Sequence, residues 1–99
     1  MYNGNSMSQQ KRINRDDAET IALQALAYLA DDPQRLTRFL ALTGTDAGEL
    51  RTQVNSSDFQ VAILDYMMSD ESLLLTFCQE SGIDPTVFAS AHALLSGHW

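Results

Sequence analysis

Apolar residues recur every three or four positions along most of this chain, which is the spacing of one face of an α-helix. The first stripe follows Asn14, a residue type that caps helices, and an acidic first turn. We therefore expect a helix over residues 15–30. Its buried face should be Ala18, Ile21, Ala22, Ala25, Leu26 and Leu29.

Two more helices are expected before the middle of the chain. Asp32 stands directly before a proline, an order typical of a helix start, and Gly44 suits the left-handed position after a helix end. Asp46 and Glu49 have the spacing of a capping box. They predict a third helix that continues through Val54.

The second half of the chain predicts the same series again. Ser57 and Gln60 form a second capping pair ahead of a fourth helix. Asp70 should cap a fifth helix that ends at Gly82, and Asp84 with the following proline should open a sixth. No segment alternates with a period of two over the length of a strand. The predicted fold class is therefore all-α, a compact bundle of about six short helices.

The two halves are also similar residue by residue. When residues 21–54 are shifted by 38 positions onto residues 59–92, seven of the 34 pairs are identical. The identical pairs are Leu26/Leu64, Tyr28/Tyr66, Asp32/Asp70, Leu36/Leu74, Phe39/Phe77, Gly44/Gly82 and Asp46/Asp84. They occupy core, cap and turn positions, as expected for a repeated supersecondary unit.

This similarity predicts two three-helix units, over about residues 21–54 and 59–92. Two repeats are too few for an open solenoid, so we expect them to pack against each other about an approximate two-fold axis. The shared core should be centred on Leu26, Leu36, Phe39, Leu64, Leu74 and Phe77. Residues 14–97 then form a single helical domain, and residues 1–13 a flexible N-terminal arm.

Length and composition agree with one small intracellular domain. The chain has 99 residues, the size of a single domain. The longest apolar stretch, residues 21–30, is about half as long as a membrane-spanning helix requires. The polar N-terminus lacks a secretory signal, and the single Cys78 cannot form an internal disulfide. We therefore expect a cytoplasmic protein that does not enter a membrane.

Charge is distributed unevenly along the acidic chain, whose formal net charge is −7. All six Lys and Arg residues lie in the first 51 positions, whereas residues 52–99 contain six acids and no Lys or Arg. Affinity for nucleic acid depends on cations that neutralise phosphates. Binding to nucleic acid is therefore disfavoured, and a basic protein surface is the better partner.

The halves differ in a way that suggests a covered surface on the second. Polar Arg35 and Thr37 correspond to apolar Leu73 and Leu75. One interpretation is that another part of the chain covers these leucines, because most apolar helix faces belong to the core. The other is a partner surface at Leu73 and Leu75 for a protein, with a second copy of the chain as the first candidate.

The sequence contains no catalytic or metal-binding constellation. His92 and His98 are six positions apart and face different sides of a helix, and Cys78 lies on an expected buried face with no nearby cation. The acidic pairs stand at helix starts, where capping explains them. Tyr28 and Tyr66 hold equivalent places and are expected to be core residues with bonded hydroxyls, with a small-ligand pocket lined by them as the alternative. We predict no enzyme, no catalytic residue, no metal and no cofactor.

Two long runs resemble a known group of proteins. They are AETIALQALAYLADDPQRLTRFLALTG at residues 18–44 and LDYMMSDESLLLTFCQESGID at residues 64–84. The chain resembles, over about residues 18–95, a group of short, uncharacterised bacterial helical proteins. The resemblance implies a small helical fold and assigns no activity, cofactor or catalytic residue.

A second similarity is to the helix-turn-helix. Cys78, Gly82, Ile83 and Phe88 stand where that motif places a small helix residue, the turn glycine and two apolar positions. The helix that would read DNA carries no cation, which opposes this interpretation. The leading expectation is a non-enzymatic module for protein interaction or regulation. The alternative is a degenerate helix-turn-helix protein involved in transcription.

Overall fold

The computed structural model describes residues 13–97, and these residues form helices without any strand. The predicted all-α class is therefore confirmed. A short 3₁₀ helix, η1, precedes α4. The elements are α2 (Arg15–Ala30), α3 (Pro33–Thr43), η1 (Ala47–Glu49), α4 (Leu50–Gln53), α5 (Ser57–Met68), α6 (Glu71–Ser81) and α7 (Thr86–Ser96).

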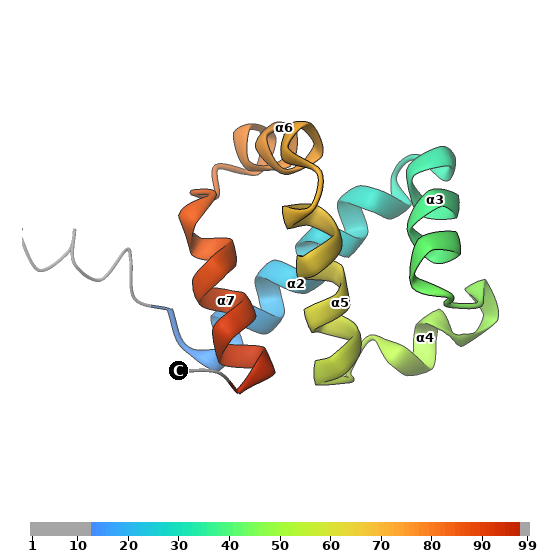
Figure 1. The fold of residues 1–99 in the computed structure, drawn as a ribbon, viewed down its shortest axis with the longest axis horizontal. Helices are drawn as coiled ribbons and strands as arrows, with labels where there is room; N and C mark the ends of the chain where they lie inside the picture. The colour runs from blue at the N-terminus through green and yellow to red at the C-terminus, as the bar shows by residue number, and fades with distance from the viewer. Residues whose placement is uncertain (1–12, 98–99) are drawn as a thin grey trace, which may run out of the picture.

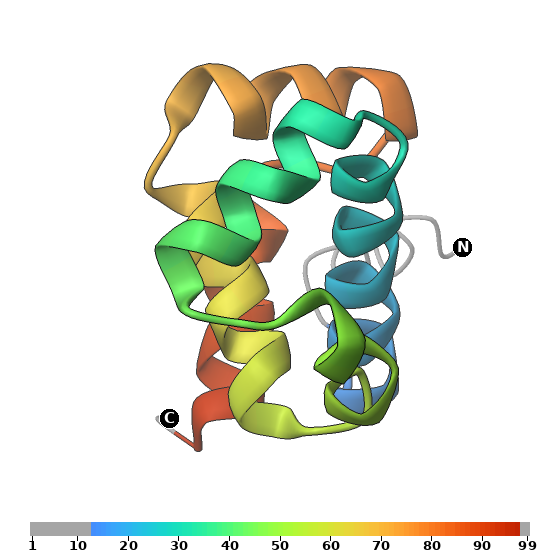
Figure 2. The same ribbon diagram turned by 90° about the vertical axis from the view of Figure 1, so that its right-hand side faces the viewer.

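Three helices form the centre of the bundle. α2, α5 and α7 pack against one another in all three pairs, whereas α3 contacts α2 and α6 contacts α5. Figure 1 shows α6 lying across one end of the molecule, with α3 and α4 together on the side away from α7. In the turned view of Figure 2, α3 crosses in front of the central helices.

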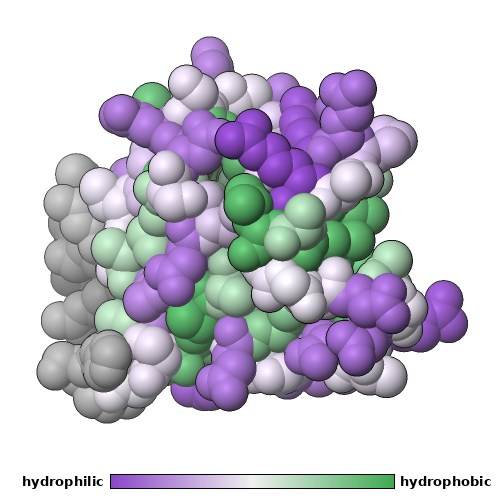
Figure 3. Space-filling model, turned by 45° about the vertical axis from the view of Figure 1, so that its right-hand side comes forward, coloured by the Kyte–Doolittle hydropathy of each residue, from purple (hydrophilic) through white to green (hydrophobic). Residues whose placement is uncertain are grey.

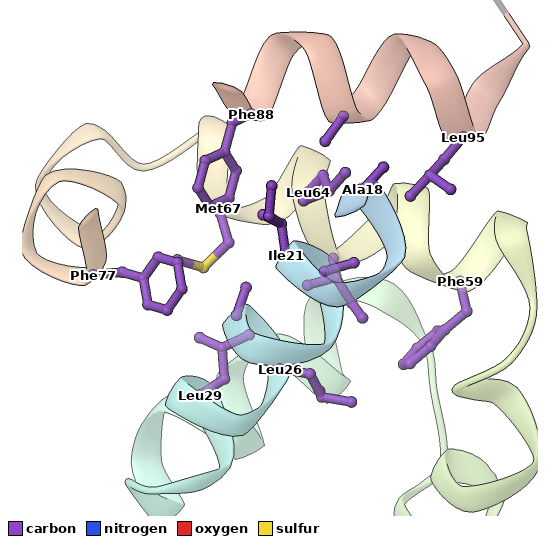
Figure 4. Close-up of a cluster of buried hydrophobic side chains, with 14 of the residues drawn as sticks. Ala18, Ile21, Leu26, Leu29, Phe59, Leu64, Met67, Phe77, Phe88 and Leu95 are labelled. Carbon is purple, nitrogen blue, oxygen red and sulfur yellow. The ribbon is translucent and has the colours of Figure 1, made fainter. Parts of the chain in front are cut away.

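The core lies between these three central helices, where most buried side chains meet (Figure 4). All six positions predicted for the buried face of α2 are buried. Of the six residues predicted to centre the shared core, Leu26, Phe39, Leu64 and Phe77 are buried. Leu36 and Leu74 are half-buried and pack against its edge, whereas the phenylalanines of the same helices, α3 and α6, are buried.

Helix α3 and helix α6 begin in the same way. The Asp32 carboxylate accepts a hydrogen bond from the backbone N–H of Gln34 at 2.9 Å, and the Asp70 carboxylate accepts one from Leu73 at 3.2 Å. Each bond satisfies a backbone donor that the first turn leaves without an intrahelical partner. The predicted caps of these two helices are confirmed.

The same two helices also end alike. Gly44 and Gly82 adopt φ values of 71° and 76°, in the left-handed region that side chains with a Cβ rarely occupy. The N–H of Gly44 donates to the carbonyl of Leu40, and that of Gly82 donates to Cys78. Both helices therefore stop at the glycine that the sequence indicates.

The third helix of the first half differs from the prediction. Asp46 makes no side-chain capping bond, and Glu49 belongs to η1, so the predicted capping box does not form. The four residues of α4 follow directly, so the segment is helical over residues 47–53 and ends next to Val54 as predicted. Gly48 weakens an α-helix at this point, which agrees with a 3₁₀ first turn.

The start of α5 is also one residue away from the prediction. The cap is Ser56, whose hydroxyl accepts from the N–H of Phe59 at 3.4 Å, and Ser57 is the first helical residue. Gln60 is buried instead of capping, because its amide donates to the carbonyl of Val54 at 2.8 Å. This bond ties the end of α4 to α5.

The last helix starts one residue later than predicted, at Thr86, and Pro85 takes the cap position instead of Asp84. The Asp84 carboxylate accepts hydrogen bonds from the backbone N–H and the hydroxyl of Thr86, at 3.0 and 2.9 Å. The predicted N-terminal arm over residues 1–13 lies outside the described residues except for Ile13. That residue is half-buried and packs against the core, so it belongs to the domain.

Two aromatic pairs connect the halves in a reciprocal manner. Tyr28 of the first half lies 5.2 Å from Phe77 of the second, between ring centroids. Tyr66 of the second half lies 5.1 Å from Phe39 of the first. The 38-residue shift takes Tyr28 to Tyr66 and Phe39 to Phe77, so a two-fold axis would exchange the two pairs. The two-fold relationship stays a prediction, and the unequal third helices limit it to the first two helices of each half.

Candidate functional site

An apolar groove lies between α2 and the segment formed by η1 and α4. Its volume is about 460 Å³. Both walls are helical, and each contributes four residues. The groove is lined by Leu23, Leu26, Ala27, Ala30, Ala47, Leu50, Arg51 and Val54.

The lining residues have the same spacing on both walls. On α2 they stand at positions i, i+3, i+4 and i+7, counted from Leu23, and the other wall repeats this spacing from Ala47. Positions spaced in this way lie on one face of a helix. One face of α2 and one face of the η1–α4 segment therefore line the groove, and these two faces do not pack closely against each other.

The α2 wall is unusually open for an apolar surface. The residue exposure of Leu23 is 37%, and Ala27 and Ala30 are also exposed, whereas Leu26 is buried at the base. Single exposed apolar residues are ordinary, but several on one helix face beside a hollow indicate a binding surface. On the side of the molecule where α3 and α4 come forward, Figure 3 shows further hydrophobic areas between polar ones.

Arg51 is the one charged residue that lines the groove. Within residues 13–97 it forms no ion pair. Exposed carboxylates stand next to lining residues in sequence, namely Asp31, Asp46 and Glu49. The groove therefore combines an apolar lining with an acidic neighbourhood and one available guanidinium group.

The acidic character is stronger in the described part than in the whole chain. Residues 13–97 contain all thirteen acids but only four of the six basic residues. Arg15 lies 3.7 Å from the Glu19 carboxylate and donates to the carbonyl of Leu94 and the hydroxyl of Ser57. The guanidinium group of Arg15 is therefore engaged within the fold. The net negative charge of residues 13–97 favours basic partners.

Arg35 is also engaged within the fold. Its Nε lies 3.9 Å from the Asp32 carboxylate, and its guanidinium carbon lies 4.3 Å from the centroid of the Tyr28 ring. The hydroxyl of Tyr28 is buried and makes no hydrogen bond with any described residue, which corrects the prediction of a bonded hydroxyl. The aromatic body of Tyr28 instead packs as a core residue.

A second hollow surface surrounds Leu42 at the end of α3. Two adjoining depressions share Leu42, Tyr66 and Ser69 as lining residues. Leu42 is 66% exposed. The remaining lining is mostly polar and includes Arg38 and Glu71, so this surface is less apolar than the groove.

The two leucines predicted as a partner surface have different surroundings. Leu73 is half-buried and packs against the core, which agrees with cover from within the chain. Leu75 is 46% exposed. The structure therefore leaves only Leu75 open to a partner.

Cys78 and His92 occupy structural positions. Cys78 is buried, and burial together with the negative charge of Asp84 raises the pKa of its thiol, which keeps it protonated at neutral pH. His92 Nε2 lies 2.7 Å from a carboxylate oxygen of Asp65, linking α7 to α5. No cluster of metal-binding side chains occurs among residues 13–97, and His98 lies outside them.

Sequence reasoning missed the groove although a signal was present. The apolar run over residues 21–30 is longer than one buried stripe requires. The predicted core face left Leu23, Ala27 and Ala30 unassigned, and these residues line the groove. A helix that is apolar on more than one side must bury the second side elsewhere or leave it open.

These features define a small all-helical protein with an open apolar groove on an acidic surface. Residues 15–98 match the family DUF3572, described as a protein of unknown function, and the chain belongs to this family. The expected membership in a group of uncharacterised helical proteins is thus confirmed. No curated protein and no solved structure matches the chain. Among the described helices, none has the length and apolar character that crossing a membrane requires.

Proposed function

We propose that this protein is a non-enzymatic module for protein interaction, and that the groove between α2 and α4 is its contact surface. The observation that carries the proposal is the open apolar face of α2, with Leu23, Ala27 and Ala30 exposed beside a hollow. Keeping such a face in water costs about 25 cal/mol per Å² of apolar area relative to burial. A protein partner would remove this cost.

The chemistry of the groove supports binding more than catalysis. Seven of its eight lining residues are apolar, and the eighth, Arg51, has no acid or base partner within the described chain. General acid–base chemistry requires positioned groups that exchange protons at the operating pH. A guanidinium group is always protonated and supplies only charge and hydrogen bonds.

The helix-turn-helix alternative has less support. The helix that would read DNA, α7, contains no Lys or Arg. Its residues Phe88, Ala91 and Leu95 are buried, and the helix packs against both α2 and α5. Fluorescence anisotropy with a random DNA duplex at low salt would test this alternative, and tight binding would favour it over the proposal.

The test of the proposal is affinity capture from cytoplasmic extract, where we expect the protein to act. We compare the full chain with Leu23→Glu, which places a charge in the groove, and with Gln24→Glu. Gln24 is exposed on α2 but outside the groove lining, so this variant controls for the added charge. Leu75→Glu tests the other exposed leucine in the same way.

We expect Leu23→Glu to lose partners that the wild type, Gln24→Glu and Leu75→Glu retain. An identical set of bound proteins for wild type and Leu23→Glu would contradict the proposal. If Leu75→Glu alone changes the bound set or the solution mass, the contact surface lies on α6, and assembly through a second copy becomes the better account.

A further inference from the structure

The two walls of the groove correspond to helices that touch each other in the second half. Under the 38-residue shift, Ala27 on one wall corresponds to Asp65, and Val54 on the other wall corresponds to His92. Asp65 and His92 lie 2.7 Å apart, where α5 packs against α7. The positions that meet in the second half therefore face an open groove in the first.

The other α2 residues that line the groove can also be compared with their counterparts on α5. Leu23 and Leu26 correspond to Val61 and Leu64 on α5. Leu64 is buried in the core, and Val61 is half-buried and packs against it. Ala30 corresponds to Met68, which is half-buried and also packs there. On α5, Leu64 is buried, Val61 and Met68 are half-buried, and the exposed Asp65 contacts His92 of α7. The matching face of α2 is more open, because Leu23, Ala27 and Ala30 are all exposed.

Looser packing of the third helix accounts for this difference. α7 has 11 residues and packs against both α2 and α5. η1 and α4 together span residues 47–53 and form the second wall of the groove, but they do not pack against α2 as closely as α7 packs against α5. The groove is thus the open space between α2 and the η1–α4 segment, at the place where the second half has a direct contact between helices.

We infer that the groove receives a short amphipathic helix from a protein partner, whose apolar stripe resembles that of α7 and whose flanks are basic. The inference rests on the proposed function and names its partner class. In α7 the buried residues Phe88, Ala91 and Leu95 stand at i, i+3 and i+7. Helix recognition in a groove uses anchors with this spacing.

Charge determines the flanks of the partner helix. The carboxylates of Asp31, Asp46 and Glu49 stand beside lining residues, and acids outnumber arginines thirteen to four over residues 13–97. Lys or Arg residues on both sides of the apolar stripe would therefore speed association and strengthen binding at low salt. A strongly acidic helix would be repelled.

The probe for this inference is a synthetic peptide with the sequence of residues 84–97, extended by a pair of lysines at each end. We titrate it into the isotope-labelled full chain and follow the backbone amide resonances. We expect saturable shifts at Leu23, Ala27 and Val54, which line the groove. The same peptide with glutamate flanks should bind more weakly by about tenfold or more.

Variants assign the peptide to the groove. Ala27→Glu should weaken binding about tenfold, since it places a charge under the apolar stripe. Ala27 is exposed, so the fold should tolerate the change. The matched control Gln24→Glu should bind the peptide as the wild type does, and equal binding by Ala27→Glu would overturn the inference.

Three other results would also overturn it. Shifts at Val61 and Met68 without shifts at the groove would mean that the peptide replaces α7. Groove resonances that change with protein concentration alone would assign the groove to a second copy. Nuclear Overhauser contacts between residues 1–12 and Leu23 would assign it to the same chain.

The failures of this inference and of the proposed function are distinguishable. Capture of partners that depends on Leu23, without any binding of the peptide, would retain the interaction module and reject the helical occupant. Capture that is insensitive to Leu23, together with no peptide binding, would reject both.

Discussion

The α2–α4 half and the α5–α7 half start with matching elements and finish with different ones. In each, a helix is followed by an 11-residue helix that an aspartate caps at its start and a left-handed glycine caps at its end. The second half then continues into α7, which packs into the core, whereas the first half ends in η1 and the one-turn α4. Matching first and second helices therefore do not ensure that the third helix covers the first helix equally in both halves.

The contrast separates residues that hold the fold from residues available for binding. α7 contributes Phe88, Ala91 and Leu95 to the core, while no residue of α4 is buried. The open groove next to α4 is then a consequence of the loose packing of η1 and α4 against α2. Substitutions at matched positions of the two halves should have unequal effects where the halves differ and equal effects where they agree.

The largest expected effect is at a matched pair in the third helices. Phe88 is fully buried, whereas its counterpart under the shift, Leu50, is half-buried at the groove. Phe88→Ala should lower the free energy of unfolding by about 3–5 kcal/mol, because it leaves a cavity in the core. Leu50→Ala should cost about 1 kcal/mol, since part of its side chain is already in water.

Urea unfolding followed by circular dichroism measures both changes. A cost for Leu50→Ala as large as that for Phe88→Ala would show that α4 supports the core as α7 does. That result would remove the basis of the comparison.

The next largest loss of stability should be equal in the two halves. Gly44→Ala and Gly82→Ala each force a Cβ into the left-handed region, and nothing within 4 Å would contact that Cβ. Each should therefore cost about 1–2 kcal/mol from backbone strain alone. Thermal unfolding of the two variants should give similar shifts, and a large cost at only one glycine would mean that the helix ends are not equivalent.

A smaller effect should depend on pH through Cys78. Burial raises the pKa of its thiol in the folded protein, so the unfolded chain loses that proton first as pH rises. The folded state binds the proton more tightly, and its stability falls above the pKa of the unfolded thiol. Cys78→Ala should lose less stability between neutral and alkaline pH than the wild type, as measured by urea unfolding.

The native thiol should also react slowly with a disulfide reagent at neutral pH, because it is both buried and protonated. Reaction as fast as in urea would contradict the buried position. An unchanged pH dependence in Cys78→Ala would show that other groups dominate the alkaline loss of stability.

The smallest effect on stability is expected in the groove. Ala27 is exposed and its counterpart Asp65 faces α7. Ala27→Glu should change the free energy of unfolding by less than about 0.5 kcal/mol, as for most surface substitutions. A loss of several kcal/mol in urea unfolding would mean that the α2 face is needed for folding and is not reserved for a partner.

Local rules predicted most of the fold from sequence. The buried stripe of α2, the aspartate caps of α3 and α6 and the terminal glycines depend on near neighbours in the chain, so periodicity and residue type were sufficient. The third helix of the first half was predicted within one residue of its observed end, but its capping box does not form and its first turn is a 3₁₀ helix that contains Gly48.

The candidate site was harder to predict because it depends on what fails to pack. Leu75 was predicted as part of a partner surface and is exposed, but Leu73 is half-buried. The groove arises where α2 and α4 lie near each other without close packing, and no local pattern specifies that distance. Only the surplus of apolar residues on α2 pointed to it.

The most direct test of the open α2 face is a photo-crosslinking amino acid placed at Leu23 in the full chain within its native cells. A second protein carries the same amino acid at Gln24, outside the groove. We predict an adduct with another protein at position 23 but not at position 24, mapped by mass spectrometry to a helix with an apolar stripe and basic flanks. An adduct within the same chain, with a second copy, or at both positions alike would contradict the account.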